Sequence, residues 1–255
     1  MMEEFVVELA GVPMQVRCQY KENKEFLRDY LSKKEPLEKI EPKKTDLEEI
    51  QKIFDSMAEK EGTKKIKYQE SFLENNAIHN LIAQKLIKYN TMLFHGSALC
   101  MDGEAYIFTA PSGTGKSTHA RLWREVFKDR VWMINDDKPL LKIENEKVTV
   151  YGTPWNGKHN LGENASAPLK AIVKIERAKE NHIEHLSSAE AFPEVLKQAF
   201  GPSDRELMVR VMELEKHLLE AVDFYRLGCN MEPVAAKTAW EGMNAGKRQE
   251  GEKYE

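Results

Sequence analysis

The sequence has 255 residues, of which 41% are hydrophobic and 31% charged, a composition typical of globular proteins rather than fibrous or disordered chains. Its 38 basic and 42 acidic side chains give a net charge of −4, which argues against a nucleic-acid or membrane partner. Three widely spaced cysteines, an acidic N-terminus and the lack of a long apolar run predict a cytoplasmic protein with reduced thiols.

The chain begins with two predicted strands. Alternating apolar residues on either side of Gly11 predict a hairpin of residues 4–10 and 12–19. The series Thr45-Asp-Leu-Glu48 has the spacing of a capping box, and it predicts a helix that begins there and ends near Glu59.

A longer helix is predicted over residues 68–89, and its apolar face is expected to be buried: Phe72, Ile78, Leu81, Ile82 and Leu86. The helical pattern stops near Asn90, where we expect a domain boundary. The expected organisation is an N-terminal α+β region (1–90), a second domain (91–246) whose motifs are described below, and a frayed, charged tail (247–255).

After Asn90 the sequence becomes rich in short apolar runs, and Asp102-Gly103 between two of them is a strong hairpin signal. The predicted strands are 91–94, 97–101, 105–109, 131–135, 140–143, 148–151, 171–176 and 224–227. The predicted helices are 118–128, 189–200, 204–219 and 233–243. Strands and helices in this mixture predict a mixed α/β fold.

Residues 110–117, Ala-Pro-Ser-Gly-Thr-Gly-Lys-Ser, lie between a predicted strand and a predicted helix, as a phosphate-binding loop does. Gly113 and Gly115 let backbone amides turn toward an anion at a helix N-terminus. Lys116 would contact the β- and γ-phosphates of ATP, and Ser117 would bind Mg²⁺. The motif departs from the usual pattern at Ala110, where glycine is standard. The residues expected to bind the nucleotide are Ser112, Gly113, Thr114, Gly115, Lys116, Ser117 and Thr118.

A predicted strand ends in the two carboxylates Asp136 and Asp137, and we expect it to lie beside the phosphate loop in a Walker-B-like position. Adjacent side chains at a strand end point in different directions, so one can face Mg²⁺ and the other an acceptor hydroxyl. A plain polar turn is the alternative, which the loop upstream disfavours. His95 precedes the loop strand, in a position where a lone histidine is more often structural than catalytic.

The segment 152–158, Gly-Thr-Pro-Trp-Asn-Gly-Lys, is a loop punctuated by glycine and proline. Its Trp155 and Lys158 could hold a substrate or the γ-phosphate, and an ordinary connection is an equally good interpretation of the composition.

Four segments together resemble a known family: HGSAL (95–99), APSGTGKS (110–117), INDDKP (134–139) and GTPWNGK (152–158). In order and spacing they are similar to the kinase domain of bacterial HPr kinase/phosphorylase, and more closely to the HPr-kinase-like group related to PEP carboxykinase. The resemblance covers roughly residues 90–200. It implies a β-rich nucleotide-binding core with flanking helices, like that of PEP carboxykinase.

The resemblance also implies roles for His95, Lys116, Ser117, Asp136 and Asp137 in catalysis. By analogy Asp137 is the base toward a hydroxyl and Asp136 binds the metal, or the reverse. The family's metal-binding glutamate segment is replaced here by residues 151–158, which leaves a third metal ligand unassigned. The first ninety residues do not resemble the N-terminal domain of HPr kinase, so recognition of HPr is not implied.

These features predict a Mg²⁺-dependent kinase that transfers the γ-phosphate of ATP to a hydroxyl group of a protein, a peptide or a small metabolite. One alternative is a nucleotide sensor without turnover, against which the aspartate pair argues. Another is a carboxykinase-like lyase, which would need further metal-binding histidine and lysine residues and a carboxylate-binding arginine. The acceptor, the choice between ATP and GTP, and the formation of a homo-oligomer stay open.

Overall fold

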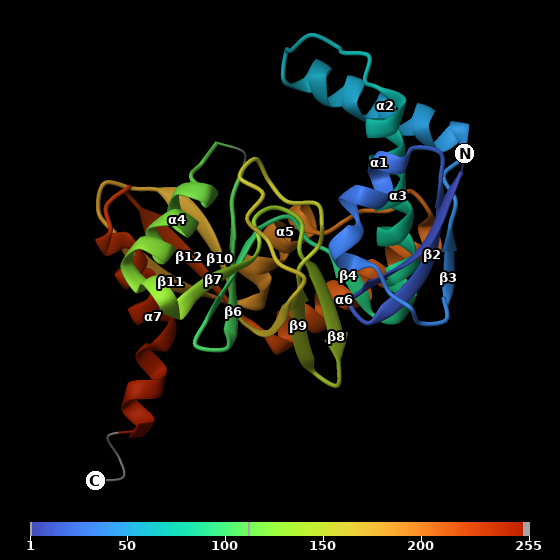
Figure 1. Ribbon diagram of the computed structural model, residues 1–255. Coiled ribbons are helices and arrows are strands. Elements are labelled where there is room, and N and C mark those ends of the chain that lie inside the picture. Colours follow the sequence, from blue (N-terminus) through green and yellow to red (C-terminus); the bar gives the residue numbers. More distant parts are fainter. Residues whose placement is uncertain (1, 112, 252–255) are drawn as a thin grey trace. The chain divides into compact units, whose positions relative to one another are not determined.

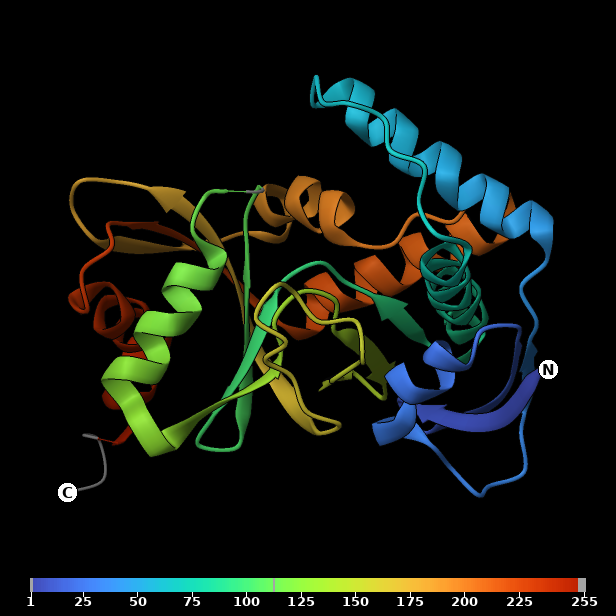
Figure 2. The same cartoon turned by 45° about the horizontal axis from the view of Figure 1, so that its top comes forward.

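The structure, a computed structural model, describes residues 2–111 and 113–251. The chain divides into two compact units, Met1–Tyr89 and Asn90–Glu255, which are described separately (Figures 1 and 2). Both contain helices and strands, which confirms the predicted mixed α/β class. None of the helices in the described ranges is long and apolar enough to cross a membrane.

The first unit contains the predicted hairpin, and Ala10 and Gly11 form its two-residue turn with φ values of 51° and 78°. A third strand, which the sequence did not predict, runs parallel to the second. The elements of this unit are β1 (Glu3–Leu9), β2 (Val12–Cys18), α1 (Lys21–Phe26), η1 (Arg28–Tyr30), β3 (Glu38–Ile40), α2 (Lys44–Lys60), α3 (Glu70–Leu86) and η2 (Ile87–Tyr89).

Two predictions about these helices were wrong. α2 is capped at Lys43 rather than at Thr45, because the carboxylate of Asp46 accepts a hydrogen bond from the backbone N–H of Lys43 at 2.6 Å. Phe72 was expected in the core, but it is 44% exposed. Its ring stacks on that of Tyr68 at a centroid distance of 5.1 Å, so part of its apolar surface contacts a neighbouring aromatic ring rather than the core.

The second unit is built on a curled sheet in the order β4-β8-β9-β10-β6-β5-β7, with β12 on β10 and β11 on β12. Its strands are β4 (Thr91–Leu93), β5 (Ser97–Met101), β6 (Glu104–Thr109), β7 (Val131–Asn135), β8 (Leu140–Glu144), β9 (Lys147–Tyr151), β10 (Ser166–Arg177), β11 (His182–Leu186) and β12 (Asp223–Cys229). The sequence predicted all of them except β11. Strand β10 joins the two parts of the sheet, because it pairs with β9 near Ala167 and, from Ala171 on, lies between β6 and β12.

Helices cover both faces of this sheet (Figure 1). They are α4 (Lys116–Phe127), η3 (Lys128–Arg130), α5 (Ser188–Gln198), α6 (Arg205–Ala221) and α7 (Val234–Gly251). Helices α4 and α7 pack together over a core that includes the fully buried Trp123, while α5 and α6 pack together elsewhere on the sheet. Helix α7 extends to Gly251, and residues 252–255 of the predicted tail lie outside the described residues.

The candidate site lies at the edge of the sheet where β6 and β7 end and β5 begins. Strand β5 is antiparallel to both β6 and β7, and it pairs Ser97 with Phe108 and Ala98 with Asn135. The ends of β6 and β7 and the start of β5 therefore meet at one edge. Strand β5 lies between β6, which leads into the loop 110–117, and β7, which ends at the two aspartates.

Candidate active site

The loop after β6 contains the two glycines of the predicted phosphate-binding motif. Gly113 and Gly115 have φ values of 74° and 131°, a region that residues with a side chain rarely adopt. Ala110 does not have a positive φ and its side chain is buried, so the loop fits alanine where the motif usually has glycine. Helix α4 begins at Lys116, directly after the loop. Ser112, which the sequence analysis included among the nucleotide-binding residues, lies outside the described residues.

Lys116 is directed into its own loop. Its Nζ donates a hydrogen bond to the carbonyl oxygen of Ala110 at 2.8 Å. Burial lowers the pKa of Lys116, and the negative charge of Asp137 opposes this shift. The cation is therefore half-buried, and its charge interacts with that of Asp137.

Arg177 supports the loop from the neighbouring strand, and the sequence analysis did not identify it. Strand β10 is parallel to β6, so its last residue reaches the same edge of the sheet. There Nη2 of Arg177 donates to the carbonyl oxygen of Gly113 at 2.6 Å, and Nε donates to that of Thr114 at 3.4 Å. In the sequence, Arg177 is a basic residue directly after the predicted strand 171–176. Only the strand order shows that this strand lies beside the one that leads into the loop.

Asp137 and His95 face each other at the edge. Nε2 of His95 lies 3.3 Å from Oδ1 of Asp137. Burial raises the pKa of Asp137, but the hydrogen bond from His95 and the charges of His95, Lys138 and Lys116 outweigh it, so that the pKa is below its ordinary value. The carboxylate is therefore ionised near neutral pH. The backbone N–H of Gly96 also donates to the carbonyl of Asp137 at 3.0 Å.

The turn that carries the two aspartates is held by Asn135, whose side chain is fully buried. Its Oδ1 accepts from the N–H groups of Asp137 (2.8 Å) and Lys138 (2.6 Å). Its Nδ2 donates to the carbonyl and the hydroxyl oxygens of Thr153, at 3.1 and 3.0 Å. Asn135 thereby joins the aspartate turn to the loop 152–165, a role that the sequence analysis did not predict.

Asp136 makes a different set of contacts. Its Oδ1 accepts a hydrogen bond from the backbone N–H of Gly157 at 2.5 Å, and its carbonyl accepts one from the hydroxyl of Ser97 at 3.1 Å. One carboxylate of the pair thus faces His95, and the other holds the loop that contains Lys158.

A cleft of about 460 Å³ collects these groups. It is lined by His95, Pro111, Gly113, Gly115, Lys116, Ser117, Thr118, Asp136, Asp137, Gly157, Lys158 and His159. Of the two residues predicted in the substrate loop, Lys158 lines the cleft, whereas Trp155 is buried at 8% exposure and is not part of the lining. Thr114, which is also predicted to bind nucleotide, is not among the lining residues, but its two neighbours in the chain, Gly113 and Gly115, are.

Comparison with known proteins adds little to this geometry. No family model and no curated protein matches the sequence. Among solved structures, one similar to this chain is the Hpr(Ser) kinase/phosphatase from Coxiella burnetii, at 10% identity and a TM-score of 0.34. The match covers 63% of this chain and 98% of that one. The proposals below are drawn from the residues of the site itself.

The cleft offers oxygen ligands of the kind that Mg²⁺ prefers. Ser117, Asp136 and Asp137 all line it, and together they provide a hydroxyl and two carboxylates. Mg²⁺ in phosphoryl-transfer sites is usually bound by one or two carboxylates together with phosphate oxygens, and this set fits that pattern. No group of three or more His, Cys, Asp or Glu side chains arranged to hold a metal occurs in the part of the chain that the structure describes.

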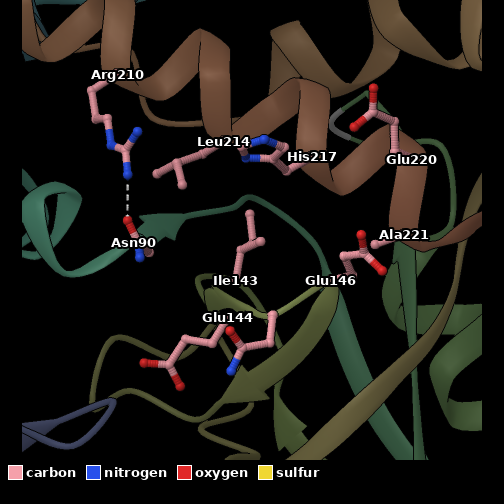
Figure 3. Close-up of a pocket in the computed structure, with 10 residues that line it drawn as sticks. Asn90, Ile143, Glu144, Glu146, Arg210, Leu214, His217, Glu220 and Ala221 are labelled. Atoms are coloured by element: carbon pink, nitrogen blue, oxygen red, sulfur yellow. Dashed lines mark hydrogen bonds between the residues drawn. The ribbon is translucent and has the colours of Figure 1, made fainter.

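A larger hollow, of about 910 Å³, lies between α6 and the β8–β9 turn (Figure 3). Arg210 reaches across it to the side chain of Asn90, with Nη2 2.5 Å from Oδ1. Three carboxylates line this hollow, those of Glu144, Glu146 and Glu220. These carboxylates would repel a triphosphate, which makes this hollow a poor candidate for a nucleotide site.

Proposed function

We propose that the second unit is a Mg²⁺-dependent kinase that transfers the γ-phosphate of ATP to a hydroxyl group. The observation that carries the proposal is that Lys116 of the phosphate loop and the His95–Asp137 pair line one cleft. A protein that only senses nucleotide needs the loop, but it does not need an ionised carboxylate held within reach of the phosphates.

Each residue then has a role. The loop amides and Lys116 bind the β- and γ-phosphates, and Arg177 keeps the loop in shape. Asp137 orients the acceptor hydroxyl and takes its proton, while His95 holds Asp137 in position. The hydroxyl oxygen forms a bond to the γ-phosphorus as the bond from that phosphorus to the bridging oxygen of ADP breaks.

Ser117 and Asp136 are the residues that would hold Mg²⁺, with the second oxygen of Asp136 available beside the one that accepts from Gly157. When bound, Mg²⁺ neutralises charge on the β- and γ-phosphates.

The test uses γ-labelled ATP, Mg²⁺ and the purified full chain, with a cell extract separated into macromolecules and small molecules. Lys116→Ala is the inactive variant, and Lys147→Ala is the matched control because Lys147 is an exposed lysine at the far end of β9. Label is expected in one fraction with the native chain and the control, and in neither with Lys116→Ala or after chelation of Mg²⁺. Tight ATP binding without any transfer would refute the kinase and favour a nucleotide sensor.

A further inference from the structure

Two basic side chains of the cleft belong to one tight turn. The backbone N–H of Asn160 donates to the carbonyl of Gly157 at 3.0 Å, and Asn160 has a φ of 48°. Lys158 and His159 are therefore the two central residues of the turn Gly157–Asn160. Both side chains are exposed and both line the cleft. We call this segment the basic turn.

The basic turn is fixed to the catalytic edge rather than free in solution. The N–H of Gly157 donates to Oδ1 of Asp136 at 2.5 Å. A Cβ atom at position 157 would lie 3.1 Å from Oδ2 of Asp136, so glycine allows this close approach. Farther along the loop, the N–H of Glu163 donates to the carbonyl of Ile134 in β7 at 3.2 Å. The loop is thus attached to β7 and the residue that follows it at two points, one at the first residue of the basic turn and one beyond its last.

The strand order places the basic turn on one side of the cleft. Along the edge of the sheet the order is the phosphate loop after β6, His95 before β5, and Asp136 and Asp137 after β7. The basic turn contacts the β7 end, and β5 separates β7 from the strand that carries the phosphate loop. A triphosphate seated on the loop would therefore leave the basic turn on the side from which the acceptor approaches Asp137.

Among the residues that the structure describes, the two side chains of the basic turn have no polar partner. Lys116 donates to Ala110 and His95 faces Asp137, but Lys158 and His159 have neither an ion pair nor a hydrogen bond with any described residue. These are two neighbouring hydrogen-bond donors that line the cleft and have no acidic partner among the described residues. Such a pair can bind an anionic group of a ligand.

We propose that the basic turn binds an anionic group of the acceptor, so that the substrate is a hydroxyl compound with a carboxylate or phosphate near the reacting hydroxyl. This inference rests on the proposed kinase function and names the substrate class for its site. The anion is held by Lys158 and His159 while the hydroxyl points to Asp137. Both a small hydroxylated acid and a serine or threonine flanked by acidic residues have this chemistry.

Transfer of label from γ-labelled ATP is measured with pairs of acceptors that differ only in the anion. One pair is glycerol 3-phosphate and glycerol, and the other is a serine peptide flanked by glutamates and the same peptide with glutamines. The native chain is compared with the double variant Lys158→Ala/His159→Ala, with the charge reversal Lys158→Glu/His159→Glu, and with the control Lys147→Ala. The two pairs separate the small-molecule source from the peptide source.

In at least one pair we expect the native chain and Lys147→Ala to use the anionic member about tenfold better, measured as kcat/KM. The double variant should lose this preference through KM for the acceptor, and the charge reversal should favour the neutral member. The affinity for MgATP should stay within about twofold of the native value, since the turn is on the acceptor side. Equal use of both members of each pair, or a loss of MgATP affinity equal to the loss of acceptor affinity, would overturn the proposal.

A binding measurement separates this inference from the kinase function. Calorimetric titrations with glycerol 3-phosphate and with the acidic peptide are made on the chain saturated with MgADP, which occupies the phosphate loop. If no acceptor is phosphorylated but one of these anions binds to the native chain and about tenfold more weakly to the double variant, the kinase function fails and the anion site stands. Binding that is absent, or unchanged by the double variant, refutes the anion site.

Discussion

Replacing Asn135 by alanine is expected to destabilise the second unit and to slow phosphoryl transfer more than it weakens ATP binding. The side chain is fully buried and links the N–H groups of Asp137 and Lys138 to the carbonyl and hydroxyl of Thr153. Alanine removes these four hydrogen bonds and leaves buried polar groups without partners. Since each buried polar group left unsatisfied costs about 1–3 kcal/mol, we expect the free energy of unfolding to fall by about 3–5 kcal/mol, with some relaxation.

The unfolding assay can isolate the second unit. All four tryptophans, at positions 123, 132, 155 and 240, belong to it, so urea unfolding followed by tryptophan fluorescence reports that unit alone. Thr153→Val removes the hydroxyl partner, and a double-mutant cycle with Asn135→Ala should give a coupling energy of about 1–2 kcal/mol.

Kinetics supply the second readout for Asn135→Ala. The variant should lower kcat while the dissociation constant for ATP changes little, because Asn135 holds Asp137 and does not contact the phosphate loop. A loss of less than about 1 kcal/mol together with additive cycle energies would refute the view that Asn135 holds the aspartate turn.

Three further substitutions test separate parts of the site. Gly115→Ala forces alanine to a φ of 131°, so the dissociation constant for ATP measured by calorimetry should rise at least about tenfold; unchanged affinity would show that the loop adapts. Arg177→Ala should raise the same constant severalfold at nearly unchanged stability, and equal binding would mean that its bonds to the loop carbonyls are not needed. Burial lowers the pKa of His119 from 6.5 to about 4, so as the pH falls the unfolded chain takes up this proton before the folded chain does. The neutral, buried His119 therefore contributes roughly 3 kcal/mol to the free energy of unfolding above about pH 6.5, and this contribution is lost as the pH falls through about 4. His119→Gln should lack this loss in urea titrations near pH 7 and pH 4, and an identical loss would assign the acid sensitivity to other groups.

Local patterns predicted most elements of the second unit because their causes are local. The Asp102-Gly103 turn adopts φ values of 53° and 84° and forms the predicted hairpin, and Gly113 and Gly115 have the positive φ that their loop requires. These conformations depend on a few neighbouring residues, so a single sequence is sufficient to predict them.

Strand order and the support of the site depend on pairing across the chain, and the sequence did not reveal them. The separation of β6 from β7 by β5 follows from how the hairpin joins the sheet, and the bond of Arg177 to the loop follows from the parallel pairing of β10 with β6. Asn135 was predicted only as the last residue of a strand, and the fold is what brings Thr153 to it. For Trp155 the sequence left a ligand contact and a structural position equally open, because an aromatic residue in a loop serves the core or a ligand according to the side on which it packs.

The edge of the sheet holds its reactive groups in place before any substrate is bound. Lys116 donates to the carbonyl of Ala110, and Asp137 faces His95. A triphosphate has to compete only with a neutral carbonyl for Lys116, and phosphate oxygens are the stronger acceptors because they are charged. A hydroxyl that donates to Asp137 can use its second oxygen while His95 stays on the first. Since both groups are already positioned by internal contacts, little of their side-chain entropy would remain to be lost when the proposed kinase binds its substrates.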